Sequence, residues 1–231
     1  MFGLNIIKNI LVFMIVYIPP FLVFAKFWRE GKRNNVVLIL IGISYMALSL
    51  FTENLIPFIF VIINLWYIRR TDEFYEFDLK NFKFFKALKM VFIFYLATIF
   101  ISAIETIVLS NFKVELKQQD IVTNMASMPL GKFLIMIPIV IIFAPILEEF
   151  VFRWLIFEKI FKKRMGIYLG AFLSSFLFAI IHFSLNAFPI ILWIGLYNCY
   201  LINKKGYWYA VFNHFTFNSI TVVALLLQKL R

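Results

Sequence analysis

The sequence predicts an all-α polytopic membrane protein, a bundle of about eight transmembrane helices around a polar cavity within the membrane. The first observation behind this prediction is composition, because 63% of the residues are hydrophobic and 31 of the 231 are Phe. A soluble domain of this length has no interior large enough for so much apolar surface, so its solvent is largely lipid. The second observation is that the apolar residues form long runs, and basic residues lie between the runs.

The runs have the length of membrane-spanning helices. A helix needs about 20 apolar residues to cross the hydrocarbon, and fewer where neighbouring helices help. The runs that meet this requirement are residues 6–25, 36–51, 55–68, 90–110, 132–157, 167–186, 188–203 and 207–228. The first run has a basic flank but no small-residue cleavage site, so it indicates a retained helix rather than a signal peptide.

The basic residues predict the topology. The second and third runs are short, and they form either one span or a hairpin that turns at residues 52–54. A hairpin places 16 of the 23 basic residues on one face. These are Lys26, Arg29, Lys32, Arg33, Arg69, Arg70, Lys80, Lys83, Lys86, Lys89, Lys159, Lys162, Lys163, Arg164, Lys204 and Lys205. The positive-inside rule assigns that face to the cytoplasm and both termini to the outside. Lys229 and Arg231 fit this assignment poorly.

The net charge of +11 indicates a lipid partner rather than nucleic acid. The charges lie between apolar runs instead of on a compact basic face, so they set topology and contact anionic lipid. Residues 73–90 place Phe74, Phe77, Phe84 and Leu88 among charged residues, which predicts an interfacial amphipathic helix or an elbow packed on the bundle. The chain has one cysteine, Cys199, so it has no internal disulfide. We find no repeat or linker, and we expect a single membrane domain over residues 1–231.

Two adjacent acids interrupt the fifth run. Glu148, Glu149 and Arg153 are ionisable groups in an apolar segment, where they cost on the order of 7–10 kcal/mol at mid-bilayer if unpaired. Glu149 and Arg153 are four residues apart and share one helix face, which predicts an ion pair. Glu148 points about 100° away and can face a cavity. Pro138 and Pro145 precede the pair and can open the helix to water.

Further polar residues lie in the sixth and eighth runs. His182 is four residues after Phe178, and His214 and Asn218 project from one helix face because they are also four residues apart. A single histidine or acidic pair can simply join helices by hydrogen bonds. Two histidines, an amide and a second carboxylate on three helices indicate a common site instead. We expect Glu148, His182, His214 and Asn218 to lie within about 10 Å of one another, around a cavity that opens to the cytoplasmic side.

These residues resemble the signature of a known family. E-E-x-x-x-R (Glu148, Glu149, Arg153), F-x-x-x-H (Phe178, His182) and H-x-x-x-N (His214, Asn218) are similar, in order and spacing, to the motifs of the CPBP family. This family comprises the type II CAAX prenyl endopeptidases and their bacterial relatives, often called Abi proteins. The resemblance covers roughly residues 130–225, the expected catalytic core. Residues 1–130 carry no motif, as is usual for the family's variable N-terminal helices.

The residue types suit hydrolysis of a peptide bond. A carboxylate in an apolar cavity is a stronger base than in water, because desolvation disfavours its charged form. Glu148 is therefore the expected base, and His182 the residue that helps to hold the water. His214 and Asn218 are the expected donors to the oxyanion. Glu149, Arg153 and Phe178 are the expected structural support. The resemblance implies the same roles.

A zinc site is the alternative at the same residues. Glu148, His182 and His214 could bind one Zn²⁺ and leave a position for water. The sequence has no H-E-x-x-H, and asparagine is an uncommon zinc ligand that suits an oxyanion donor better. We therefore expect a site without a metal cofactor. Two other functional classes stay open: a proton-coupled transporter, against which no inverted repeat appears, and a non-catalytic membrane scaffold or regulator.

The expected partners are membrane lipid and a peptide or membrane-associated protein substrate. The abundance of Phe, Ile, Lys and Asn hints at an AT-rich bacterial genome, where prenylated proteins are not expected. We therefore expect a multi-pass protein of a bacterial cell membrane that cleaves a small membrane-associated precursor. The resemblance connects such an activity with bacteriocin or pheromone processing, or with self-immunity.

Overall fold

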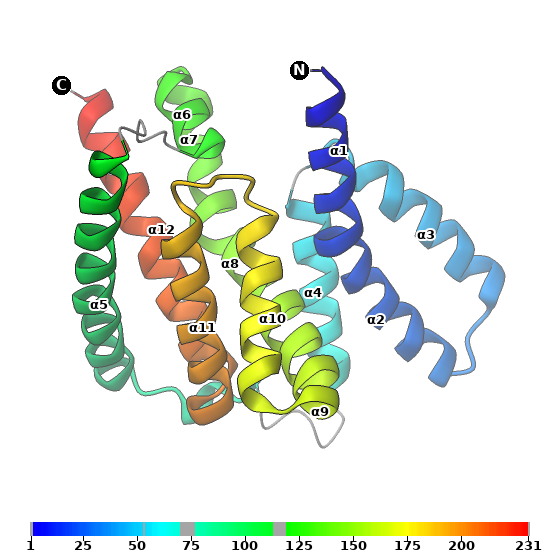
Figure 1. The fold of residues 1–231 in the computed structure, drawn as a ribbon. Coiled ribbons are helices and arrows are strands. Elements are labelled where there is room, and N and C mark those ends of the chain that lie inside the picture. The colour runs from blue at the N-terminus through cyan, green and yellow to red at the C-terminus, as the bar shows by residue number, and fades with distance from the viewer. Residues whose placement is uncertain (1, 53, 70–76, 113–118, 231) are drawn as a thin grey trace.

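The computed structural model describes residues 2–52, 54–69, 77–112 and 119–230, and every regular element within these ranges is helical. The chain starts with α1 (Phe2–Val12), a π-helical turn η1 (Phe13–Tyr17) and α2 (Ile18–Glu30), which follow one another without a break. Helix α3 (Asn35–Ser49) begins where the Asn34 side chain accepts a hydrogen bond from the Val36 amide at 2.7 Å. It turns back into α4 (Leu55–Ile68) and leans away from the bundle (Figure 1).

The middle of the chain supplies the longest helices. Helix α5 (Phe84–Asn111) is followed by the short helix α6 (Asp120–Ser127). Next comes a helical rod with two π-helical stretches: α7 (Leu130–Pro138), η4 (Ile139–Phe143), α8 (Ala144–Glu148), η5 (Glu149–Phe161) and α9 (Lys162–Met165). A π-helical turn holds one residue more than an α-helical turn, so it changes which side chains face the bundle.

The last three helices pack closely on that rod. They are α10 (Ile167–Ile180), α11 (Phe188–Lys205) and α12 (Tyr207–Lys229). The turns before α10 and α12 are tight because Gly166 and Gly206 adopt φ values of 80° and 103°, which only glycine reaches without strain. Helix α11 packs against α10 and α12, and α10 also packs against η5 (Figure 1). This C-terminal bundle holds the polar residues of the candidate site.

The predicted all-helical membrane fold is confirmed. Four helices are long and apolar enough to cross a membrane: Ile6–Glu30, Phe84–Asn111, Leu130–Met165 and Tyr207–Lys229. The shorter apolar helices are Asn35–Ser49, Leu55–Ile68 and Ile167–Ile180. With the 18-residue α11, all eight predicted runs fall on helices. The protein is thus an integral, multi-pass membrane protein.

One predicted boundary needs correction, and one alternative that the sequence left open is decided. The run at 167–186 does not stay helical to its end, because α10 stops at Ile180 and the chain turns at Phe183, which has a φ of 50°. Residues 77–83 form an elbow packed on the bundle rather than an interfacial helix. Phe77 is buried against Trp154 and Tyr207, and the Trp208 indole donates to the Phe77 carbonyl at 2.6 Å. Phe74 lies outside the described residues.

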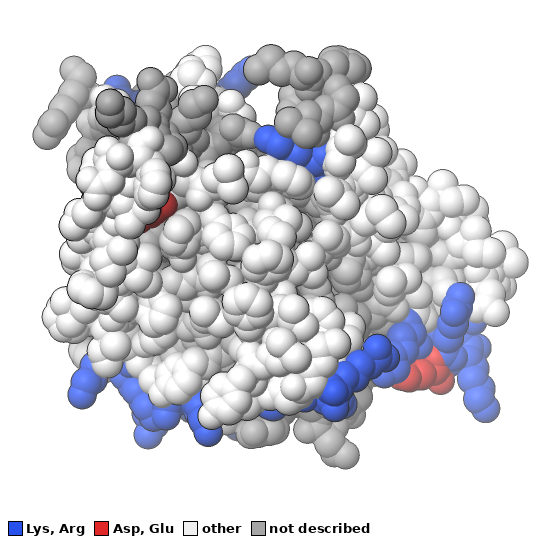
Figure 2. Space-filling view, in the orientation of Figure 1, with Lys and Arg blue, Asp and Glu red and all other residues white. Residues whose placement is uncertain are grey.

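The predicted hairpin and charge asymmetry are both present. Helices α3 and α4 run in opposite directions, and the described basic residues of the predicted cytoplasmic face gather at one end of the helices (Figures 1 and 2). Both ends of the described chain lie at the opposite end (Figure 1). Lys229 lies there because its ammonium donates to the carbonyls of Ala126 and Met128, at 2.8 and 2.5 Å. Its position is thus explained by a local contact with the turn between α6 and α7.

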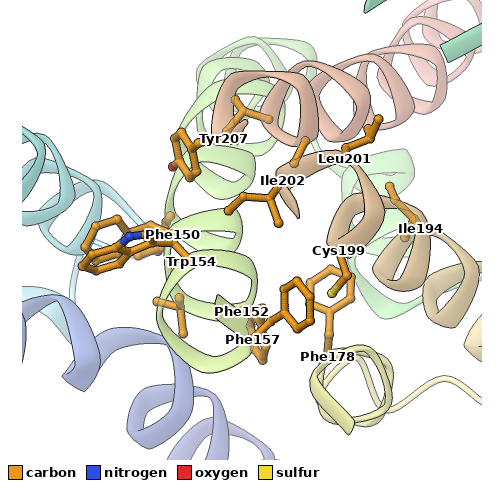
Figure 3. Close-up of a cluster of buried hydrophobic side chains, with 14 of the residues drawn as sticks. Phe150, Phe152, Trp154, Phe157, Phe178, Ile194, Cys199, Leu201, Ile202 and Tyr207 are labelled. Atoms are coloured by element: carbon orange, nitrogen blue, oxygen red, sulfur yellow. The ribbon is translucent and has the colours of Figure 1, made fainter. Parts of the chain in front are cut away.

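An aromatic core fills the bundle between the middle of the rod and its basic end. Phe150, Trp154 and Tyr207 pack on one side, and Phe152, Phe157 and Phe178 pack around Cys199 on the other (Figure 3). All seven side chains are buried. Because η5 runs from Glu149 to Phe161, this core lies between the acidic pair and the basic residues that follow it.

The contact between α10 and α11 depends on Gly195. A Cβ atom at this position would lie 2.7 Å from the Ser175 Cβ and 3.0 Å from its Cα. We predict that Gly195→Ala lowers the free energy of unfolding by about 1–3 kcal/mol, because the helix backbones must separate. The measurement is the melting temperature in detergent. Gly131→Ala is the matched control, since its Cβ meets nothing within 4 Å; equal melting temperatures for the two variants would contradict this packing argument.

Candidate active site

The acidic pair sits where α8 passes into η5, and its two members face different surroundings. Glu149 is fully buried, whereas 18% of the Glu148 side chain stays exposed. This is the division that the helical spacing predicts, since successive residues point about 100° apart. One carboxylate is therefore enclosed in the bundle, and its neighbour faces a cavity.

The Glu149 carboxylate joins three segments of the chain. Its Oε2 lies 3.1 Å from Nε of Arg153, which confirms the predicted ion pair. Its Oε1 accepts from Nδ1 of His214 on α12 at 2.7 Å and from the Asn198 amide on α11 at 2.9 Å. A buried charge is tolerated where it is paired and hydrogen-bonded, and Glu149 meets both conditions. The attachment of His214 to Glu149 is a feature that the spacing of the residues did not predict.

Two buried amides extend this network. The Asn213 amide donates to the Asn198 side-chain oxygen at 2.9 Å, and the Asn198 amide donates in turn to Glu149. Both asparagines are fully buried. The sequence analysis missed Asn198, although an amide in the middle of a predicted span is itself a signal, because polar groups are costly in lipid. Asn198 thereby fixes the orientation of the Glu149 carboxylate.

Phe178 lies between the buried cation and the two histidines. The guanidinium carbon of Arg153 is 4.2 Å from the centre of the Phe178 ring, close enough for a cation–π contact. The rings of His182 and His214 lie 4.7 and 5.9 Å from the same ring, both edge-on. The phenylalanine of F-x-x-x-H thus separates Arg153 from the imidazoles by packing.

His182 lies just beyond the end of α10, and the last turn of that helix holds it. Its Nδ1 is 2.7 Å from the carbonyl oxygen of Phe178. A carbonyl can only accept, so Nδ1 is assigned the proton and Nε2 carries a free lone pair. His182 is therefore oriented as a hydrogen-bond acceptor for a group in the cavity.

Asn218 is held by a carbonyl that the proline-interrupted rod leaves unpaired. In the π-helical turn η4, the acceptor Val140 would pair with the residue five positions later, which is Pro145 and has no N–H. The Asn218 amide donates to the Val140 carbonyl instead, at 2.9 Å. An amide nitrogen has two hydrogens, so one remains for another acceptor.

One cavity of about 500 Å³ brings these side chains together. Glu148, His182, His214 and Asn218 all line it, so the predicted convergence on one cavity is confirmed. Nε2 of His214 lies 3.7 Å from Oε2 of Glu148. The cavity does not open at the basic face, which the sequence analysis assigned to the cytoplasm and expected to carry the opening. Its outer lining comes from α1, α6 and the α10–α11 loop, which lie at the end of the chain termini, opposite the basic face (Figure 1).

The candidate zinc ligands are Glu148, His182 and His214. The two histidines each hold Nδ1 on a fixed partner and leave Nε2 towards the cavity, as zinc ligands commonly do. However, within the described part of the chain, no group of three or more His, Cys, Asp or Glu side chains could hold a metal ion. The described side chains thus give the zinc alternative at Glu148, His182 and His214 no direct support.

Because Glu149 is buried and paired whereas Glu148 faces the cavity, the glutamine variants of the two acids should differ in stability. We expect Glu149→Gln to lower the free energy of unfolding by about 3–5 kcal/mol, because Arg153 keeps its charge inside the bundle without a partner. Glu148→Gln is the matched variant and should melt close to the original protein, since Glu148 faces the cavity. Thermal unfolding in detergent measures both. Equal losses in the two variants would show that the acids share one structural role.

Comparison with known proteins agrees with the motifs. Residues 130–220 match the family model described as Type II CAAX prenyl endopeptidase Rce1-like. No curated protein and no solved structure matches the chain. The matched segment begins at the start of α7, ends within α12 and contains every residue of the site described above. Residues 130–220 are thus similar to the Rce1-like type II CAAX prenyl endopeptidases, which supports the family that the motifs indicate.

Proposed function

We propose that this protein hydrolyses a peptide bond of a small membrane-associated peptide or protein precursor, using a water molecule activated by Glu148. The observation that carries the proposal is the orientation of the groups around one cavity. Glu148, His182 and His214 each present a carboxylate or a ring nitrogen to it, while their neighbours Glu149 and Phe178 hold the two histidine rings. A catalytic set needs such fixed groups around one reacting atom.

The proposed reaction begins with a water between Glu148 and His182. The carboxylate takes one proton from the water, and the oxygen attacks the carbonyl carbon of the scissile bond. Nε2 of His182 can accept the second hydrogen of this water, because Nδ1 donates to the Phe178 carbonyl. When the tetrahedral intermediate collapses, the C–N bond breaks and Glu148 passes its proton to the leaving amine.

His214 and Asn218 are the proposed donors to the oxyanion. The second amide hydrogen of Asn218 is available, since only the first is directed to Val140. Nε2 of His214 donates when the ring carries a proton on both nitrogens, and that cation then has Glu149 at 2.7 Å and Glu148 at 3.7 Å. Preorganised donors of this kind are usually the largest single contribution to catalysis.

The proposed mechanism uses no metal ion. Asn218 suits an oxyanion donor better than a zinc ligand, and the described side chains do not gather as a metal centre does. The abundance of Phe, Ile, Lys and Asn favours a bacterial cell membrane. The substrate we propose is a leader peptide, pheromone or bacteriocin precursor. Processing of such a peptide, or self-immunity against it, is the biological role we propose.

The base is tested by Glu148→Gln. We expect this variant to lose turnover and to stay folded, because a glutamine amide cannot take the proton from water. Its loss of chemistry also makes it a substrate trap: captured peptides are identified by mass spectrometry and then offered to the original protein in proteoliposomes. Glu30→Gln is the control, since Glu30 lies on the surface beside Lys26. Full cleavage of a captured peptide by Glu148→Gln would contradict the role of this carboxylate.

The metal-free proposal predicts that activity survives dialysis against a strong chelator. Metal content is measured on the same sample, because a buried ion can exchange slowly. Asn218→Ala and His214→Gln should each lower turnover by about 10²–10³ and leave substrate binding largely intact. About one equivalent of zinc per chain, lost together with activity in His214→Gln, would replace this proposal by the zinc alternative.

A further inference from the structure

The mouth of the cavity and the basic face lie at opposite ends of the helices. We infer that the active site opens to the non-cytoplasmic side of the membrane and acts on a peptide segment that has already been translocated. This inference rests on the proposed function for its substrate, whereas the side of the opening stands on geometry and charge alone. It assigns the substrate a compartment and a conformation, neither of which the family match supplies.

The outer part of the cavity is built by segments far apart in the sequence. Helix α1 contributes Lys8 and Asn9, the turn before α4 contributes Asn54, and the segment at α6 contributes Gln119 and Asn124. All these segments lie at the end where the chain begins and ends (Figure 1). A water molecule or peptide that reaches Glu148 through this opening comes from that side.

The opposite end of the cavity is closed by the aromatic core. The chain leaves Glu149, passes through Phe150, Trp154 and Phe157, and reaches the basic residues only afterwards. Phe150 and Phe157 are fully buried, and Trp154 is 4% exposed. The hydroxyl of Tyr207 donates to the Ile146 carbonyl at 2.6 Å and ties α12 to this part of the rod. Figure 3 shows this packed layer, and along η5 it lies between Glu149 and the basic residues that follow Phe157.

The charges identify which end faces the cytoplasm. At the mouth, the described Lys and Arg residues are Lys8, Lys132 and Lys229, and the last of these is bound to two carbonyls. The described members of the basic face lie at the other end (Figure 2). They are Lys26, Arg29, Lys32, Arg33, Arg69, Lys80, Lys83, Lys86, Lys89, Lys159, Lys162, Lys163, Arg164, Lys204 and Lys205. An imbalance of this size retains the basic end in the cytoplasm.

The mouth has the chemistry of a peptide-binding surface. Side-chain amides donate and accept hydrogen bonds, so they match both the N–H and the C=O of an extended backbone. Besides Asn218, four amides line the cavity, all in its outer part: Asn9, Asn54, Gln119 and Asn124. Glu148 is the only acid among the described lining residues. We therefore propose an extended, translocated segment of a membrane-attached peptide as the substrate, with its backbone held by the four outer amides.

The side of the opening is tested with single cysteines. Cys199 is buried and is first replaced by alanine, and then Asn124→Cys marks the mouth and Lys163→Cys marks the basic face. Intact cells are treated with a membrane-impermeant charged maleimide, and permeabilised cells give the total reactivity of each position. We expect at least tenfold more labelling of Asn124→Cys than of Lys163→Cys in intact cells, and equal labelling after permeabilisation.

The opposite pattern, with Lys163→Cys labelled in intact cells and Asn124→Cys protected, would overturn the inference. Asn9→Cys gives a second position at the mouth if Asn124→Cys does not fold. Adding Glu148→Gln to the same background should leave the labelling unchanged, because the readout does not depend on turnover. The labelling can therefore contradict the proposed side of the opening while peptide cleavage is still observed. Equally, the labelling can support that side while no cleavage is found.

The substrate is tested by the position of the cleavage site. Peptides captured by Glu148→Gln and cleaved by the original protein should carry the scissile bond in an exported segment. A cleavage site within a cytoplasmic segment of the captured protein would overturn the proposed substrate. In that case the amides at the mouth would have to serve a purpose other than binding the substrate.

Discussion

The buried carboxylate of Glu149 is the group on which the arrangement of the site depends. It is a full charge inside an apolar bundle, and it is tolerated only because Arg153, His214 and Asn198 surround it. These partners come from η5, α12 and α11, so satisfying one charge fixes three helical segments relative to one another. The same contacts direct Nε2 of His214 towards Glu148. The geometry of the proposed chemistry is therefore a consequence of how a structural charge is neutralised.

A second constraint acts on the backbone of the interrupted rod. In a bilayer, every carbonyl that loses its helical partner must find another, because no water replaces it. The carbonyl of Val140, whose π-helical partner would be Pro145, accepts from the Asn218 amide. The hydroxyls of Tyr207 and Ser174 donate to two further carbonyls of the rod, those of Ile146 and Phe152. Asn218 consequently combines a structural hydrogen bond with its proposed catalytic one. Any loss of turnover on its removal must be compared with the melting temperature of the same variant.

The sequence predicts those parts of the site that depend on local spacing. Residues four apart share a helix face, and this rule alone pairs Glu149 with Arg153 and places Glu148 elsewhere. The charged loops likewise predict the α3–α4 hairpin. Spacing does not predict contacts between helices, such as that of Asn198 with Glu149, because the position of α11 is set by packing against other helices, as at Gly195 beside Ser175 of α10. Spacing also does not predict at which end of the helices the cavity opens, because α1 and α6 line the mouth and carry no motif.

The closed inner end of the cavity also bears on whether the protein is a hydrolase or a transporter. Both classes of protein can use acidic residues within the membrane. A transporter must expose its binding site to each side of the membrane in turn, through two halves that rock against each other. Here the polar site and the basic end are separated by a layer that includes Phe150, Phe157 and Tyr207, all fully buried. Opening that layer would remove large aromatic side chains from their packing and would break the bond between Tyr207 and Ile146. A hydrolase needs no such passage, because water, substrate and products can use one opening. The described packing is thus sufficient for hydrolysis at a one-sided cavity, whereas transport would require a second arrangement of this aromatic layer.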